Sequence, residues 1–119
     1  MGYFDLNPEV KRFPPDQTSI LNLTVEPLSD LTRIRILIEI TPFEQPPTIE
    51  LILYDFSGQV VASTLIVEPP FWRHDLIMHL KDPEISKLEY KLVAQIIYPD
   101  QPIRGQKSLS FFMDKMDSD

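Results

Sequence analysis

The segment "LTRIRILIEIT", residues 31–41, alternates apolar and polar side chains along most of its length. Successive side chains of a β-strand point to opposite faces, so every second residue shares one face. The pattern therefore predicts a strand with one face toward a core and the other toward water. The expected inward set is Ile34, Ile36, Ile38 and Ile40, and the expected outward set includes Arg33, Arg35 and Glu39.

Six further segments have the length and composition of strands, and most of the chain's 12 prolines lie between them. Proline cannot donate a hydrogen bond to a sheet, so it marks strand ends and connections. Short strands at this spacing are typical of sandwiches and barrels. We predict an all-β, seven-stranded antiparallel sandwich with at most one short helical turn, at residues 82–88. The six segments are residues 18–26 (with Leu21, Leu23 and Val25 on one face), 48–54, 59–67, 71–80, 89–98 and 106–113.

A chain of 119 residues has the size of a single domain. We expect an irregular N-terminal arm at residues 1–17, the sandwich at 18–113 and an acidic C-terminal tail at 114–119. The chain has no cysteine, which excludes disulfides, zinc thiolate sites and iron–sulfur clusters. Together with an N-terminus unlike a secretory signal, this predicts a cytoplasmic protein.

The segment "YKLVAQIIY", residues 90–98, is followed by a short connection and then "KSLSFFM", residues 107–113. This pair resembles the last hairpin of the fibronectin type III and immunoglobulin-like sandwiches. The resemblance implies a tyrosine corner, in which the hydroxyl of Tyr90 bonds to nearby backbone and Ile85 is its apolar partner upstream. The only tryptophan, Trp72, falls later than those families place theirs. The resemblance concerns the fold and does not carry a function.

Both histidines lie in "FWRHDLIMHL", residues 71–80. His74 and His79 have opposite parity in a strand and stand about 16 Å apart, so they cannot bind one metal ion. Asp75 follows His74 and points to the other face, so it cannot orient that ring. We expect His74 near the rim of the sandwich with one ring nitrogen hydrogen-bonded. No nucleophile motif or phosphate-binding loop accompanies it. We therefore predict no enzyme activity and no catalytic, cofactor or metal site.

The net charge of −7 makes the chain repel phosphate, which predicts no nucleic-acid partner and no binding to anionic membranes. We expect the outward glutamates Glu26, Glu39 and Glu50 to face arginines or lysines on neighbouring strands. The turn "DFSGQ", residues 55–59, places Gly58 where a positive φ is available.

The segment "QVVASTLIV", residues 59–67, carries no charge and is apolar on both parities. One interpretation is a strand covered by the chain itself, for which arm residues such as Tyr3, Phe4, Leu6 and Phe13 are available. The other is an exposed apolar surface that meets a protein partner or a second copy. Parity places Val61 with Leu65, and Val60 with Ile66. The candidate interface residues are Val60, Val61, Leu65, Val67, Phe71 and Trp72.

These patterns favour a non-catalytic interaction or assembly domain that binds through a sheet face or edge. The alternative is a small enzyme or ligand-binding protein whose pocket is formed by loops at one end of the sandwich.

Overall fold

The computed structural model describes residues 10–28, 32–80, 89–101 and 105–113, and these contain seven strands and one 3-10 turn. The turn, at Pro15–Gln17, is not at residues 82–88, which lie outside the described residues. Each strand falls within one of the seven segments expected from the alternation, apart from one residue at the end of β1. The strands are β1 (Ile20–Pro27), β2 (Arg33–Ile40), β3 (Thr48–Tyr54), β4 (Val60–Val67), β5 (Arg73–His79), β6 (Glu89–Ile97) and β7 (Gln106–Phe112).

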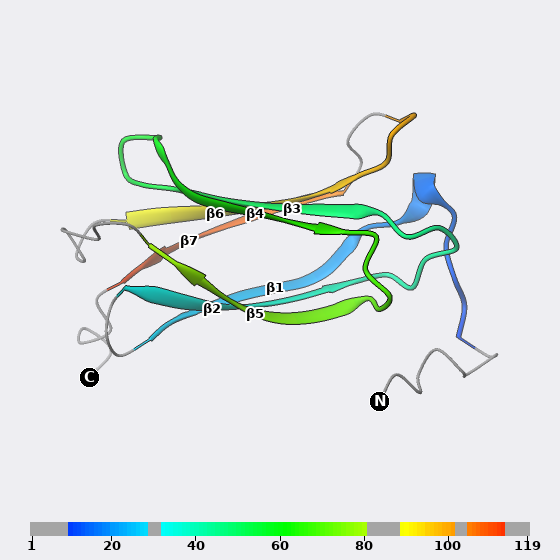
Figure 1. Cartoon of the computed structure of the whole chain (residues 1–119), viewed down its shortest axis with the longest axis horizontal. Coiled ribbons are helices and arrows are strands. Elements are labelled where there is room, and N and C mark those ends of the chain that lie inside the picture. Colours follow the sequence, from blue (N-terminus) through cyan, green and yellow to red (C-terminus); the bar gives the residue numbers. More distant parts are fainter. Residues whose placement is uncertain (1–9, 29–31, 81–88, 102–104, 114–119) are drawn as a thin grey trace.

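The strands form two layers that pack face to face (Figure 1). One sheet has the order β1-β2-β5 and the other the order β4-β3-β6-β7, and every neighbouring pair is antiparallel. The predicted seven-stranded immunoglobulin-like sandwich is confirmed. Since the outer strands of the two sheets are β1, β5, β4 and β7, the sandwich has two flanks. At one flank β4 lies near β5, and at the other β1 lies near β7.

The alternation in residues 31–41 correctly identifies the core side of β2. Its four isoleucines are almost fully buried, and they face apolar residues of the opposite sheet. Burying a side chain of this size stabilises the fold by roughly 1.5–3 kcal/mol relative to leaving it exposed. The contribution of the opposite sheet comes from β3 and β6, through Ile49, Leu51, Leu53, Leu92, Ala94 and Ile96.

Two irregularities shift side chains away from their expected faces. In β1 the register with β2 slips between Ile20 and Asn22, so Leu21 is an extra residue. Leu21 is 48% exposed, which corrects the expectation that it shares the buried face of Leu23. In β4 the register with β3 slips at Tyr54, which pairs with Val60 while the preceding residue of β3 pairs with Ala62. A bulge of this kind reverses the parity of the residues beyond it.

The β3–β4 turn has the expected geometry. Gly58 has a φ of 90°, a conformation that glycine adopts without steric cost. A carboxylate oxygen of Asp55 accepts hydrogen bonds from the backbone N–H of Ser57 at 2.8 Å and of Gln59 at 3.0 Å. The hydroxyl of Ser57 donates to the same oxygen at 2.7 Å. This hydroxyl bond, followed by the backbone bonds, lowers the pKa of Asp55.

The end of the sandwich opposite this turn is closed by the described part of the N-terminal segment (Figure 1). Phe13 forms a parallel bridge with Phe43 and donates its backbone N–H to the carbonyl of Pro42 at 2.9 Å. It therefore packs at this end rather than along β4. The hydroxyl of Tyr98 donates to the carbonyl of Gln45 at 2.7 Å. Burial raises the pKa of Tyr98.

Tyr90 is buried and stacks on Phe111, with 5.9 Å between the ring centroids. The upstream residues that a tyrosine corner would use, including Ile85, lie outside the described residues. The corner hydrogen bond therefore stays a prediction. Within the described residues, a comparable bond is made by Tyr98, whose hydroxyl donates to the carbonyl of Gln45 in a distant connection.

Candidate interaction surface

β4 lies at an edge of its sheet, where it pairs with β3 and, within the described residues, with no other strand. Its outward side chains are among the most exposed apolar groups of the molecule. The exposed fractions are 58% for Val60, 56% for Leu65 and 65% for Val67. An edge strand presents N–H and C=O groups to any chain that approaches. In β4 these backbone groups lie beside an apolar side-chain row.

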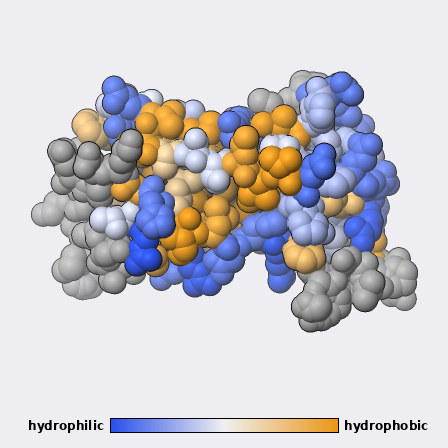
Figure 2. Space-filling model, in the orientation of Figure 1, coloured by the Kyte–Doolittle hydropathy of each residue, from blue (hydrophilic) through white to orange (hydrophobic). Residues whose placement is uncertain are grey.

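A groove of about 500 Å³ runs along the flank between β4 and β5, where the two sheets separate. Its β4 wall includes Val61, Ala62 and Thr64, and its β5 wall includes Leu76 and Ile77. Figure 2 shows that hydrophobic surface gathers over this flank, with polar surface toward both ends. The groove and the outward row of β4 together form one uncharged surface, which we call the β4–β5 flank.

The structure divides the six candidate interface residues into three groups. Val60, Leu65 and Val67 share the outer face of β4. Val61 points toward the core and contacts it at the groove. The parity expected for β4 is therefore wrong at its first residues, because the bulge places Val60 with Leu65 and separates Val61 from it.

Phe71 and Trp72 lie in the connection between β4 and β5. The ring of Trp72 meets Phe43 edge-to-face at 6.2 Å, and the guanidinium of Arg12 lies 5.1 Å from its centroid. The tryptophan therefore closes the end of the core and does not extend the apolar row of β4.

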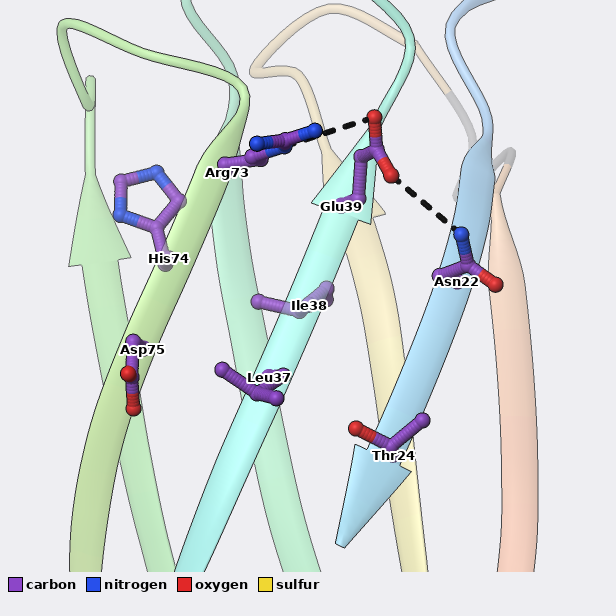
Figure 3. Close-up of a pocket in the computed structure, with 8 residues that line it drawn as sticks. All are labelled: Asn22, Thr24, Leu37, Ile38, Glu39, Arg73, His74 and Asp75. Carbon is purple, nitrogen blue, oxygen red and sulfur yellow. Dashed lines mark hydrogen bonds and ion pairs between the residues drawn. The ribbon is translucent and has the colours of Figure 1, made fainter.

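The outer face of the β1-β2-β5 sheet carries charged side chains, which β4 lacks. A shallow hollow of about 400 Å³ there is lined by both polar and apolar side chains from all three strands, including Asn22, Leu37 and Arg73 (Figure 3). Glu39 accepts a hydrogen bond from Asn22 at 3.3 Å and lies 3.7 Å from Arg73. The predicted pairing of an outward glutamate with a basic residue on a neighbouring strand is therefore observed for Glu39, whose partner is Arg73. Glu50 instead accepts a hydrogen bond from Gln95 at 2.7 Å.

Asp75 is paired with Arg35 on the neighbouring strand. The two groups form a bidentate contact, with N–O distances of 2.9 and 2.5 Å. The hydrogen bonds from Arg35 lower the pKa of Asp75, and those to Asp75 raise the pKa of Arg35. Asp75 is therefore paired with an arginine. It points to the other face of the sheet from His74, which leaves it available for this pairing. The sequence pattern offered no signal for this partner, because Arg35 and Asp75 are 40 residues apart.

The histidines lie on opposite faces, as expected. His74 is half-buried on the inner side, where its Nε2 lies 3.0 Å from the carbonyl oxygen of Phe71. His79 is exposed and opposite Arg33 in the register. Among the described residues no group of three or more His, Asp or Glu side chains could hold a metal ion. The same part of the chain contains no helix long and apolar enough to span a membrane.

No protein-family model matches the chain, and no curated protein matches it. Solved structures with a similar fold include a β-glucuronidase from Parabacteroides merdae, with a TM-score of 0.65 and 18% sequence identity over 81% of this chain. A β-glucuronidase from Bacteroides uniformis gives a TM-score of 0.63 and 16% identity over 80% of this chain. A glycosyl hydrolase family 2 member from Bacteroides cellulosilyticus gives 0.58 and 12% over 81%.

The matched segments are small parts of these enzymes: 13%, 12% and 15% of the three chains, respectively. At such identities the similarity establishes the fold. The chain thus shares its fold with one segment of several large glycosidases.

Proposed function

We propose that this chain is a non-catalytic interaction or assembly domain that binds a protein through the β4–β5 flank. The observation that carries the proposal is the exposure of Val60, Leu65 and Val67 in one row at an edge strand without charge. A contiguous apolar surface of this kind is costly to leave in water and is typical of a binding surface.

The carboxylates support a non-catalytic role. Acid–base chemistry requires an acid or base that is free to exchange a proton with a substrate. Asp75 is engaged by Arg35, and Glu39 by Arg73 and Asn22. The hollow that these residues line is on a sheet face rather than among loops at one end. The glycosidases of similar fold fit the same interpretation, because the segment they share with this chain is a small fraction of each enzyme.

The net charge of −7 further supports a protein partner over nucleic acid or an anionic membrane. The lack of cysteine supports a reducing compartment such as the cytoplasm.

The test compares wild-type protein with a variant of the flank and a matched variant elsewhere. Val67→Lys adds a charge to the exposed row of β4, and Thr24→Lys adds the same charge to the exposed outer face of β1. Immobilised proteins would be exposed to a native-host lysate to which tagged copies of the chain are added. We expect a protein bound by the wild type and by Thr24→Lys, but reduced at least tenfold with Val67→Lys.

Binding that Thr24→Lys abolishes and Val67→Lys leaves intact would contradict the proposal. An activity assay completes the test: we expect no hydrolysis of aryl glucuronides or galactosides above the buffer rate. Turnover that Glu39→Gln or Asp75→Asn removes would favour the enzymatic alternative.

A further inference from the structure

We infer that the partner of the β4–β5 flank is a second copy of this chain, whose β4 pairs antiparallel with β4 about a two-fold axis at Leu65. This inference rests on the proposed function and names the occupant of its surface. The argument uses the backbone of β4, its two ends and the charges on the four edge strands.

The first step concerns which backbone groups of β4 are available. The N–H of Glu68 donates to the carbonyl of Pro47 at 3.0 Å, on the side of β3. The N–H and C=O groups of successive strand residues point alternately to the two sides of the strand. Ser63, Leu65 and Val67 therefore direct their N–H and C=O groups away from β3, toward the edge of the sheet that no described strand covers.

The second step is symmetry. Ser63 and Val67 lie two residues on either side of Leu65. With Leu65 opposite its own copy, Ser63 is opposite Val67 of the second molecule and Val67 is opposite Ser63. Residues that face each other in this way exchange two N–H···O=C bonds. Every free backbone group of Ser63, Leu65 and Val67 is then satisfied by an identical strand.

The third step is length. Glu68 ends β4 with a φ of 47°, and it is followed by two prolines. At the other end, the bulge at Val60 and Val61 interrupts the regular edge. The usable edge is therefore a short segment, and a partner strand must end as abruptly at matching positions. The β4 strand of a second copy meets this requirement, because the same bulge and the same two prolines limit its regular edge to the same residues.

The fourth step is charge. Two copies of a chain with a net charge of −7 repel each other, and an uncharged surface adds no local like-charge repulsion to this. β4 has no charged residue, whereas β1 carries Glu26, β5 carries Arg73 and Asp75, and β7 carries Lys107. Charged residues on an edge strand hinder pairing with another strand. β4 is the edge strand without charged side chains, so its self-pairing places no like charges of the strand opposite each other at any register.

The pairing also covers the groove. Opposite residues of an antiparallel pair point to the same side of the sheet, so the inner faces of both copies lie on one side of the joined sheet. The two β5 strands then face each other across the axis. Leu76 and Ile77, which line the groove in one molecule, approach their counterparts in the other.

Single-cysteine variants test the register directly, because the chain has no cysteine of its own. Residues opposite each other at a hydrogen-bonded site have Cα atoms about 5.5 Å apart, which a disulfide can span. Leu65→Cys should form a disulfide-linked dimer under mild oxidation. Ser63→Cys should not, because its counterpart is four residues along the strand, about 13 Å away. A mixture of Ser63→Cys and Val67→Cys should cross-link to the mixed dimer.

Sedimentation equilibrium supplies the second measurement. We expect the wild-type chain to dimerise at micromolar concentration and Leu65→Lys to weaken dimerisation at least a hundredfold. The control Phe112→Lys adds the same charge to an exposed apolar position on β7 and should leave dimerisation unchanged. Circular dichroism on each variant verifies that it is folded.

The inference is overturned if the folded wild type stays monomeric at hundreds of micromolar, or if Ser63→Cys cross-links as well as Leu65→Cys. A different protein captured through Val67 by a monomeric chain would overturn the inference and leave the proposed function standing. A monomer with no partner that depends on Val67 would overturn both.

Discussion

β2 and β4 are eight-residue strands in the same sandwich, yet they follow different rules. β2 is a central strand, paired with β1 and β5, and its side chains alternate strictly between buried isoleucine and more exposed, mainly charged positions. β4 is an edge strand, paired with β3, and it keeps apolar residues on both faces.

The difference separates what the fold requires from what it does not. Alternation in β2 places apolar groups inside and polar groups outside, and burial alone accounts for it. Burial accounts for the inner face of β4 but not for Val60, Leu65 and Val67 outside it. A lysine or glutamate at these positions would hinder pairing of this edge with another strand. The apolar outer row of β4 therefore indicates a contact beyond the fold of one molecule.

Hydrogen exchange should show the largest difference between the two strands. In dilute, monomeric protein the amides of β2 should exchange through global unfolding, which costs about 5–15 kcal/mol for a typical domain. The amides of Ser63, Leu65 and Val67 should exchange with almost no protection, while those of Thr64 and Ile66 are protected by β3. NMR-detected exchange measures each amide. Equal protection of Leu65 and Thr64 in the monomer would contradict the free edge.

The next largest difference between β2 and β4 should be in the free energy of unfolding that is lost when an apolar side chain is shortened. Ile36→Ala leaves a cavity in the core and should lower the free energy of unfolding by about 2–5 kcal/mol. Leu65→Ala, which also shortens an apolar side chain, should change it by less than about 0.5 kcal/mol, since Leu65 is more than half exposed. Urea denaturation of the monomer measures both. A large loss with Leu65→Ala would mean that the outer row of β4 belongs to the core.

The turn that leads into β4 allows a smaller test. Gly58 has a φ of 90°, and a Cβ added there would meet no atom within 4 Å, so Gly58→Ala introduces backbone strain without a steric clash. We expect a loss of about 1 kcal/mol in the free energy of unfolding. Gln59→Ala is the control, because Gln59 bonds to Asp55 through its backbone: its N–H donates to the carboxylate, and its carbonyl accepts the backbone N–H of Asp55 at 2.9 Å. Similar losses in the two variants would contradict this account of the turn.

The smallest effect concerns the charged face of β2. The folded protein holds the pKa of Asp75 below its ordinary value of 3.8, so the ionised carboxylate contributes stability above that pH. This contribution is lost as the pH falls through the lowered pKa. Asp75→Asn should therefore weaken the decline in stability between about pH 4 and 2. Acid titrations of urea midpoints measure it, and 1 M salt should reduce the difference, because the Arg35–Asp75 pair is exposed.

The sequence was sufficient for the strand pattern and the core face of β2, because a period of two follows directly from strand geometry. It failed at Leu21 and Val60, since a bulge is decided jointly by two strands and leaves no mark in one of them. The sequence also contained no sign that the hydroxyl of Tyr98 bonds to distant backbone, because this bond joins Tyr98 to Gln45, 53 residues away. The candidate interface was predicted from the absence of charged residues in residues 59–67. That Val61 and Trp72 instead pack against the core could not be predicted, because it depends on tertiary contacts.

The strand order also has a consequence for synthesis of the chain. β3 and β4 form a local hairpin, but the other neighbour of β3 is β6, whose last residue, Ile97, follows the last residue of β4, Val67, by 30 residues. At ribosomal rates of about 5–20 residues per second, the completed hairpin exists for roughly 1.5–6 seconds before all of β6 has been made. During this interval both faces of β4 are exposed to neighbouring nascent chains. Dilution on the polysome and the acidic residues at positions 50, 55 and 68 must then prevent the pairing that two finished molecules would make.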